Sequence, residues 1–366
     1  MARDTLPENT SPENTSPENA DPENASPKSA GPENSRPENA GAVLRSALTR
    51  WDTALLVVLA AVVVVAGLAV DGFATGRNAQ FLLLDVVAIA LIALPLTLIV
   101  ITGEIDLSVA STLGLCSAVM GQLWVAGLPL ELIVVLVVLL GAVLGAVNAV
   151  FVTRFALPSL AVTIGTLAAY RGLAFVVLGD QAVADFPADW TAAASSTVAG
   201  GGVPWAVVVA LALAVVFGVV LHATPFGRSL YAMGNNAEAA AFAGIRVARA
   251  KSWLFVVSGA VSGLAGVYWT LRFASARADN AAGLELAVVA AVLLGGVSIF
   301  GGRGTLLGVL AGVLLLGAVR NALQLADVAA DTLDVVTGGL LIASVVVPNA
   351  VTLGRARLRR GRRRPT

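Results

Sequence analysis

The sequence predicts an all-α polytopic membrane protein with about ten transmembrane helices and one short helix in a cytoplasmic loop. The chain has 366 residues, of which 57% are hydrophobic and only 13% are charged, and its mean hydropathy is +0.86. A soluble domain carries about 25% charged residues. The apolar residues form long Val, Leu, Ala and Gly runs without the period-two alternation of a β-barrel. Because backbone polar groups in lipid must be bonded internally, these runs are expected to be helices.

The N-terminal segment, residues 1–50, predicts a disordered cytoplasmic tail. Seven five-residue units begin at prolines between Pro7 and Pro37, and six of them read Pro-Glu-Asn. Proline at every fifth position and the scarcity of apolar side chains exclude a helix or a packed core. We expect no secretory signal, since the first apolar run begins only near Ala54.

The body of the chain, residues 51–352, predicts one transmembrane domain. A bilayer core of about 30 Å requires about 20 mostly apolar residues per helix. The expected spans are about 54–70, 81–101, 107–126, 130–152, 157–178, 205–222, 252–271, 285–300, 305–323 and 333–350.

Lysine and arginine in the short connections predict the orientation. The connections on the side of the N-terminus hold the cations Arg154, Arg228, Arg246, Arg249, Lys251 and Arg303. The basic tail, residues 353–366, holds seven arginines on the same side. The opposite side holds Arg77 and, near span ends, Arg272 and Arg277. We therefore expect a multi-pass protein of the plasma (inner) membrane with both termini in the cytoplasm.

Glycines at spacings of three and four recur inside several spans, as in Gly141 and Gly145 and in Gly259 and Gly263. This spacing places them on one helical face, where two backbones can approach closely. Ordinary helix packing is the expected role, and sliding of these faces during a transport cycle is the other interpretation.

Two acids, Glu104 and Asp106, stand between the second and third spans in the stretch ITGEIDLSVAS. An ionisable group at membrane depth is costly and often marks a transport pathway or a switch. The alternative is a short interfacial turn in which Asp106 caps the next helix near Ser108.

Polar residues also recur inside the fourth and fifth spans. Asn148 interrupts an apolar helix, and Thr163, Thr166 and Tyr170 follow one helical face. These hydroxyls either bond to backbone carbonyls or line a polar conduit for a sugar-like solute. Arg171, in the outer half of the fifth span, requires a partner or water.

A polar, basic segment, His222–Lys251, interrupts the apolar body. Asn235 and Asn236 are good N-cap residues, Glu238 falls in the first turn and Gly244 is a suitable stop. The resulting helix of about two turns is too short to be stable alone in water. It therefore predicts a docking surface for a partner or, alternatively, a helix that lies on the membrane.

Five glycines and Arg303 between Gly295 and Gly304 predict a tight turn between the eighth and ninth spans. The pattern lacks the Gly-Lys-Ser/Thr ending of a phosphate-binding loop, so ATP must be used by another chain. We identify no catalytic residue, metal ligand or cofactor site. His222, the only histidine, lies at a span end, and Cys116, the only cysteine, lies in an apolar run.

Four ordered motifs give the chain a resemblance to a known family. They read GEIDLSVAS, GAVNAVFVTRFALPSLAVTIGTLAAYRGLA, FGRSLYAMGNNAEAAAFAGI and LLGGVSIFGGRGTLLGVLAGVLLLGAVRNAL. The chain resembles the permease subunits of ribose-, xylose- and rhamnose-type ABC importers over about residues 50–350. The stretch around Ala156–Pro187 is more similar to the rhamnose and autoinducer 2 branch than to the ribose branch. That family usually has glycine at the position of Glu104.

The resemblance implies a cytoplasmic ABC ATPase, an extracellular solute-binding protein, a second permease in a homodimer or heterodimer, and a small sugar as substrate, with no role for nucleic acid. It also implies that the short loop helix couples to the ATPase. The contact residues carried over from the family motif are Gly234, Asn235, Asn236, Glu238, Ala239, Ala240, Gly244 and Ile245.

The expected function is therefore a non-enzymatic permease that translocates a monosaccharide, rhamnose in preference, by alternating access. Autoinducer 2 or another pentose or hexose is the alternative substrate. Two rival interpretations remain: a proton-coupled secondary sugar transporter using Glu104 and Asp106, and a membrane enzyme acting on lipid-linked sugar.

Overall fold

The computed structural model describes residues 50–198, 202–329, 332–343 and 346, which all belong to one unit spanning residues 44–366. The two predicted tails, 1–50 and 353–366, lie outside the described residues except for Arg50. Their predicted disorder and cytoplasmic location stay predictions.

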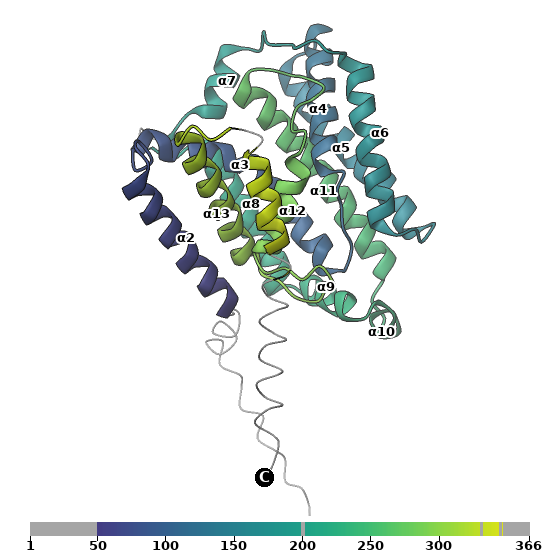
Figure 1. The fold of residues 1–366 in the computed structure, drawn as a ribbon. Helices are drawn as coiled ribbons and strands as arrows, with labels where there is room; N and C mark the ends of the chain where they lie inside the picture. The colour runs from purple at the N-terminus through teal and green to yellow at the C-terminus, as the bar shows by residue number, and fades with distance from the viewer. Residues whose placement is uncertain (1–49, 199–201, 330–331, 344–345, 347–366) are drawn as a thin grey trace, which may run out of the picture. The chain divides into compact units, whose positions relative to one another are not determined.

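The described part of the chain is helical and contains no strand beyond isolated bridges (Figure 1). In chain order the helices are α2 (Arg50–Ala69), α3 (Gly76–Ile101), α4 (Val109–Val125), α5 (Leu130–Thr153), α6 (Ser159–Leu178), α7 (Ala188–Ser195), α8 (Trp205–Ala223), α9 (Pro225–Asn235), α10 (Ala237–Phe242), α11 (Val247–Phe273), α12 (Leu284–Leu294), α13 (Leu306–Leu325) and the helix Thr332–Ala343.

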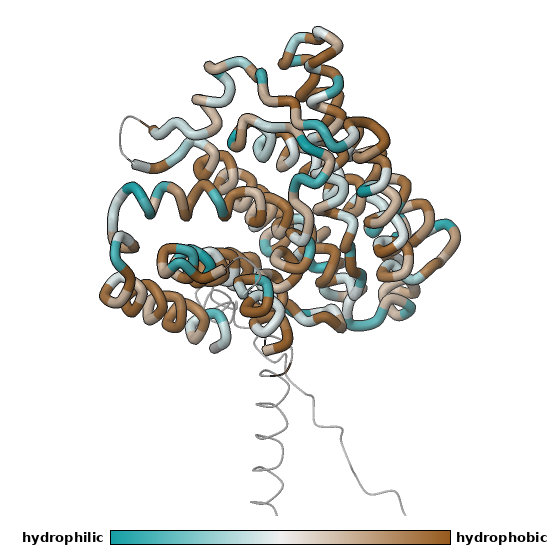
Figure 2. Tube along the Cα trace, turned by 45° about the horizontal axis from the view of Figure 1, so that its top comes forward, coloured by the Kyte–Doolittle hydropathy of each residue, from teal (hydrophilic) through white to brown (hydrophobic). Residues whose placement is uncertain are grey.

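Each of the ten expected spans corresponds to one of these helices, which confirms the all-α membrane fold. Seven helices are long and apolar enough to cross a membrane, while α4, α12 and Thr332–Ala343 are apolar but shorter. Figure 2 shows hydrophobic colour along most of the helix lengths and hydrophilic colour mainly at turns and connections. Exposed apolar side chains such as Val65, Val176 and Val215 fit helices that face lipid.

The helices differ from the approximate expected bounds in two places. The eighth span was expected to reach residue 300, but α12 ends at Leu294 because Gly296 adopts a φ of +86°. The start of the polar segment, for which the sequence indicated no helix, forms α9. Thr224 caps this helix by accepting a hydrogen bond from the Gly227 amide, and Pro225 occupies its first turn.

Helix α3 is the centre of the fold. Every residue from Val86 to Ile101 is buried, because α8, α11, α12 and α13 pack around it. Helix α2 packs against α13 instead and leaves much of its apolar surface exposed. A helix that is apolar on all sides is the pattern expected for the interior of a membrane bundle.

The helices define two ends of the bundle. At the α9–α10 end, α3, α5, α8 and α12 finish and α4, α6, α11 and α13 begin. At the α7 end, the connections 179–204 and 274–283 meet in an isolated bridge between Val183 and Ala276. Figure 1 shows α7 at the top and α9 and α10 at the bottom.

The predicted glycine packing is present where α5 crosses α11. A Cβ atom on Gly259 would lie 2.1 Å from the Gly141 carbonyl oxygen, and one on Gly145 would lie 2.2 Å from the Phe255 carbonyl oxygen. The two backbones are therefore in direct contact, and only glycine permits this approach.

Candidate functional site

Helix α10 forms at the place the sequence indicates. Asn236 is its N-cap, and its side-chain oxygen accepts a hydrogen bond of 2.9 Å from the Ala239 amide. The helix ends at Phe242, and Gly244 follows with a φ of +86°. Ala240 is the buried residue that fixes this six-residue helix to the bundle. Asn235, the other predicted cap, is the last residue of α9 instead.

The junction between α9 and α10 is locked to the end of α3. Gly234 packs so closely that a Cβ atom there would lie 1.9 Å from the Ile101 carbonyl oxygen. The Gly302 amide donates a 2.8 Å hydrogen bond to that same oxygen. The junction is therefore in direct backbone contact with both α3 and the glycine-rich connection 295–304.

Tyr231 adds a second tie between α9 and the glycine-rich connection. Its hydroxyl donates a 2.8 Å hydrogen bond to the Gly304 carbonyl. Burial, together with the nearby charge of Asp52, raises the pKa of Tyr231 to about 12. The hydroxyl therefore keeps its proton and stays a donor throughout the physiological pH range.

The predicted coupling residues divide into two groups by exposure. Gly234, Ala240 and Ile245 pack into the molecule wholly or partly. The exposed members form one surface, which we call the α10 surface: Asn235, Asn236, Glu238, Ala239 and Gly244. Phe242 extends this surface and is 93% exposed. A large apolar side chain so fully exposed is suited to a partner's pocket.

The two acids between α3 and α4 have different environments. Glu104 forms an ion pair with Lys251 of α11, in which both side chains are largely buried. Asp106 is buried and accepts hydrogen bonds from the Ser108 amide at 3.0 Å and the Ser108 hydroxyl at 2.7 Å. Asp106 thus bonds to Ser108, the N-cap residue of α4, and not to an amide within the first turn of that helix.

Asn148 of α5 joins the polar cluster around Asp106. Its side-chain nitrogen donates a 2.8 Å hydrogen bond to the Ser108 hydroxyl oxygen. Its side-chain oxygen is buried and has no hydrogen-bond partner among the described residues. Ser258 of α11 approaches the other Asp106 oxygen at 3.5 Å. The cluster thus ties α4, α5 and α11 together near the α9–α10 end.

The three hydroxyls of the fifth predicted span that the sequence singled out bond to backbone carbonyls. Thr163 donates to Ile105 at 3.3 Å, Thr166 to Val162 at 3.1 Å and Tyr170 to Leu144 at 2.9 Å. This is the alternative that the sequence left open beside a polar conduit. Three cavities in the described part of the chain lie at the α7 end. None of them is lined by these three hydroxyl residues or by Glu104, Asp106 or Asn148. Their role in a solute pathway stays a prediction.

A cavity of about 630 Å³ with a mixed polar and apolar lining opens at the α7 end. We call it the α3–α13 cavity, because it lies between these helices, the end of α11, the start of α12 and the helix Thr332–Ala343. Its size is within the range of about 300–1,000 Å³ that is usual for small-molecule sites. Its polar lining residues are Asp85, Arg277, Asp279, Asn280, Arg320, Asn321, Gln324, Asp334 and Thr337.

The charges of this cavity occur in opposite pairs. Arg277 donates two hydrogen bonds to Asp279, at 2.8 and 2.9 Å. Arg320 lies 3.6 Å from Asp334. The third pair joins Asp85 to Arg272, whose guanidinium stands 3.7 Å away.

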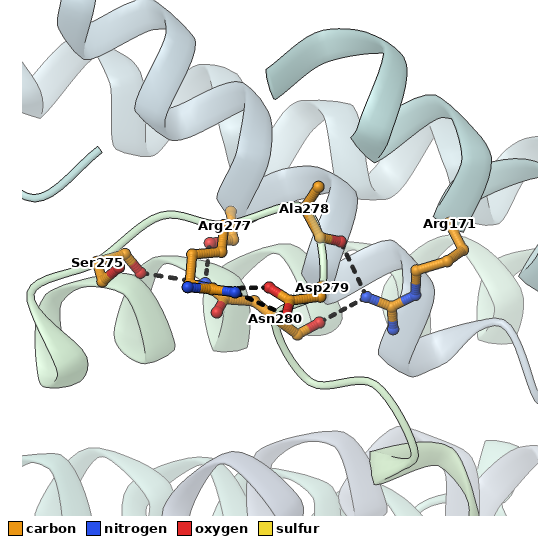
Figure 3. Close-up of polar contacts among 7 residues, drawn as sticks. Arg171, Ser275, Arg277, Ala278, Asp279 and Asn280 are labelled. Carbon is orange, nitrogen blue, oxygen red and sulfur yellow. Dashed lines mark hydrogen bonds and ion pairs between the residues drawn. The ribbon is translucent and has the colours of Figure 1, made fainter. Parts of the chain in front are cut away.

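The connection 274–283 presents the Arg277–Asp279 pair on a fixed platform (Figure 3). Arg171 of α6 donates hydrogen bonds to the carbonyls of Ala278 at 3.2 Å and Asn280 at 2.7 Å. The Asn280 side chain in turn donates to the Ser117 hydroxyl oxygen at 2.8 Å. These backbone carbonyls are the partner that Arg171 required.

The Arg277–Asp279 pair stays charged at physiological pH. The hydrogen bonds from Arg277 hold the pKa of Asp279 below its usual value of 3.8. A lowered folded-state pKa means that the pair stabilises the connection at every pH above that usual value. The stabilisation is lost as the pH falls through the lowered pKa.

Comparisons with known proteins place the chain in a family. A family model described as "Branched-chain amino acid transport system / permease component" matches residues 78–345. The Autoinducer 2 import system permease protein LsrD of Yersinia enterocolitica (serotype O:8 / biotype 1B) is 32% identical over 311 residues, which are 83% of this chain and 93% of that relative. The protein of that name from Escherichia coli K12 is 34% identical over 281 residues, 75% of this chain and 84% of the relative. No solved structure matches the chain significantly.

The chain belongs to this permease family. The match confirms the resemblance to sugar importers of the ribose and autoinducer 2 type, and this permease is an integral multi-pass membrane protein. As a permease subunit it is a non-enzymatic transport component. The family implies an ATPase and a solute-binding protein as separate partners.

Sequence analysis of the permease missed the α3–α13 cavity. Asp85, Arg277, Arg320 and Asp334 come from four separate segments, so no local motif joins them. The available signal was charge: each lies in or beside an apolar span, where an ionisable side chain is costly without a partner.

The ion pair between Lys251 and Glu104 leads to a stability prediction. We expect Lys251→Met to cost the permease about 1–3 kcal/mol, since it leaves a largely buried carboxylate without its cation. Glu104→Gln in the same chain should restore most of the loss. Thermal unfolding in detergent of the wild type, both single variants and the double variant measures this coupling. Additive losses in the double variant would contradict it.

Proposed function

We propose that this permease is the membrane subunit of an importer for autoinducer 2 or a closely related small sugar-like solute. The observation that carries the proposal is the similarity to autoinducer 2 import permeases over most of both chains. The relatives favour this substrate, which the sequence suggested as the alternative, over rhamnose. The chemistry of the α3–α13 cavity, whose lining is rich in carboxylate, amide and guanidinium groups, agrees with a hydroxylated solute.

We propose further that the α9–α10 end faces the cytoplasm. Basic residues gather in its connections and adjoining helix ends, namely Arg154, Arg228, Arg246, Arg249, Lys251 and Arg303. An excess of lysine and arginine in short connections is typical of the cytoplasmic side. Both termini would then also be cytoplasmic, and the solute-binding protein would approach the α7 end.

The proposed mechanism is alternating access driven by a separate ATPase that binds the α10 surface. ATP binding would displace α10, and the junction at Gly234 would pass the displacement to α3 and to the connection 295–304. The partner can favour one state of the permease only through its differential affinity for the two states. A second permease, identical or related, would complete the importer.

Uptake in reconstituted vesicles tests this proposal. Vesicles holding the permease with its ATPase, a second permease if required, and the binding protein should take up autoinducer 2 only when ATP is supplied. Excess unlabelled autoinducer 2 should compete better than rhamnose. Uptake that continues without ATP and stops on collapse of a proton gradient would instead support the rival secondary transporter.

A further inference from the structure

The charged side chains that line the α3–α13 cavity are balanced once Arg272, which stands beside Asp85 but does not line the cavity, is counted with them. Its lining carries Asp85, Asp279 and Asp334 against Arg277 and Arg320, and Arg272 supplies the cation beside Asp85. An anionic or cationic solute would pay a desolvation penalty on entering the cavity. It would find no unpaired opposite charge there to offset that penalty, because each charged side chain already has a partner. A neutral solute does not meet this penalty.

The same lining offers donors and acceptors side by side. Each arginine–aspartate pair sets a guanidinium beside a carboxylate, and the Asp85, Asp279 and Asp334 side chains are 52%, 50% and 77% exposed. A hydroxyl both donates and accepts, so adjacent hydroxyls can bond to both members of a pair. Trp269 and Phe273 add an aromatic wall, with ring centroids 4.9 Å apart, for the apolar face of a ring.

We infer that the α3–α13 cavity is a binding site for a small, uncharged, hydroxyl-rich solute, and that its paired arginines and aspartates exclude charged ones. The inference rests on the proposed function only for the identity of the solute. The site stands at the α7 end, opposite to the α10 surface.

The Arg277–Asp279 pair is the specificity element of this site. It borders the α3–α13 cavity and also a smaller pocket of about 100 Å³ beside Phe175 and Gln181. Arg171 anchors the connection through the backbone carbonyls of Ala278 and Asn280, which a change of the Asp279 side chain leaves intact. Asp279→Asn therefore removes one negative charge from the site and leaves the anchors in place.

A single accessible cysteine provides the test. Ala282 lines the cavity, is exposed and can be replaced by cysteine, while the native Cys116 is buried and out of reach of a thiol reagent. In vesicles holding the complete importer, autoinducer 2 or rhamnose should slow labelling of Ala282→Cys, about tenfold at ten times the dissociation constant. Gluconate, an anionic polyol, should not slow it. Ala126→Cys at the same end lies outside the cavity and should be labelled without protection.

The charge change gives the decisive comparison. In the Asp279→Asn background, gluconate should protect Ala282→Cys. Glu131→Gln removes an acid at the same end that lines neither cavity, and it should leave gluconate without effect.

Four outcomes separate the inference from the proposed function. The inference is overturned, even if ATP drives uptake, if gluconate slows labelling of Ala282→Cys in the permease that keeps Asp279. It is equally overturned if neither autoinducer 2 nor rhamnose slows that labelling. Failure of Asp279→Asn to admit gluconate overturns the assigned role of the pair. Protection without ATP-driven uptake keeps the site and overturns the proposed function.

Discussion

We expect Glu238→Arg to lower ATP-driven uptake about tenfold or more while the permease stays folded in the membrane. Glu238 is exposed in the first turn of α10 and makes no ion pair with the described residues. Reversing a charge near a helix N-terminus costs only about 0.3–1 kcal/mol. The fold should therefore survive, while a partner shaped for the α10 surface would meet an opposite charge. A tenfold loss corresponds to about 1.4 kcal/mol of coupling.

Ala239→Pro probes the same surface through the backbone. Proline at this position removes the amide that Asn236 caps and disfavours the helical conformation of Glu238. Both variants should separate ATP hydrolysis from uptake, so hydrolysis should no longer rise when solute-loaded binding protein is added. Uptake of labelled autoinducer 2 and phosphate release from the same vesicles measure the two activities.

Glu131→Arg is the matched control for the charge reversal. Glu131 is an exposed acid in the first turn of α5, at the opposite end of the bundle. Its reversal should leave both activities near the wild-type values. Wild-type uptake by Glu238→Arg and Ala239→Pro would remove the α10 surface from the coupling mechanism.

The parts of this fold that could be predicted are those that depend on residues close together in the sequence. A run of about 20 apolar residues can form little other than a helix that is buried in the bundle or faces lipid. The cap at Asn236 and the stop at Gly244 are equally local, and both are present. Helix α9 carried comparable signals, Thr224 before Pro225 and buried positions at Leu230 and Met233, which were outweighed by the polar character of the segment.

The parts that could not be predicted depend on contacts between distant segments. A hydroxyl in a membrane helix must find an acceptor, but the sequence does not tell whether this is its own backbone, as for Thr166, or another helix, as for Tyr170. Arg171 required a partner, and its carbonyl acceptors lie over a hundred residues further along the chain. The α3–α13 cavity arises in the same way, from charges on separate segments.

Substitution of the glycines between α5 and α11 should have the largest effect on stability. We expect Gly259→Ala to destabilise the permease strongly, at the upper end of the range of about 1–3 kcal/mol for overpacking or beyond it. The added methyl group would lie 2.1 Å from the Gly141 carbonyl oxygen and 2.8 Å from the Gly145 amide nitrogen. No side-chain rotation can relieve a contact with backbone, so the helices must move apart.

Gly165→Ala is the control because it makes the same chemical change in another span. Gly165 lies within α6, and a Cβ atom there would meet nothing within 4 Å. Alanine should stabilise that helix by up to about 1 kcal/mol through its higher helix propensity. The measurement is the fraction of protein that stays monodisperse after heating in detergent. Compared with the wild type, this fraction should fall at a lower temperature for Gly259→Ala and at an equal or higher temperature for Gly165→Ala. Equal behaviour of the two variants would show that the α5–α11 backbones are not in contact in the membrane.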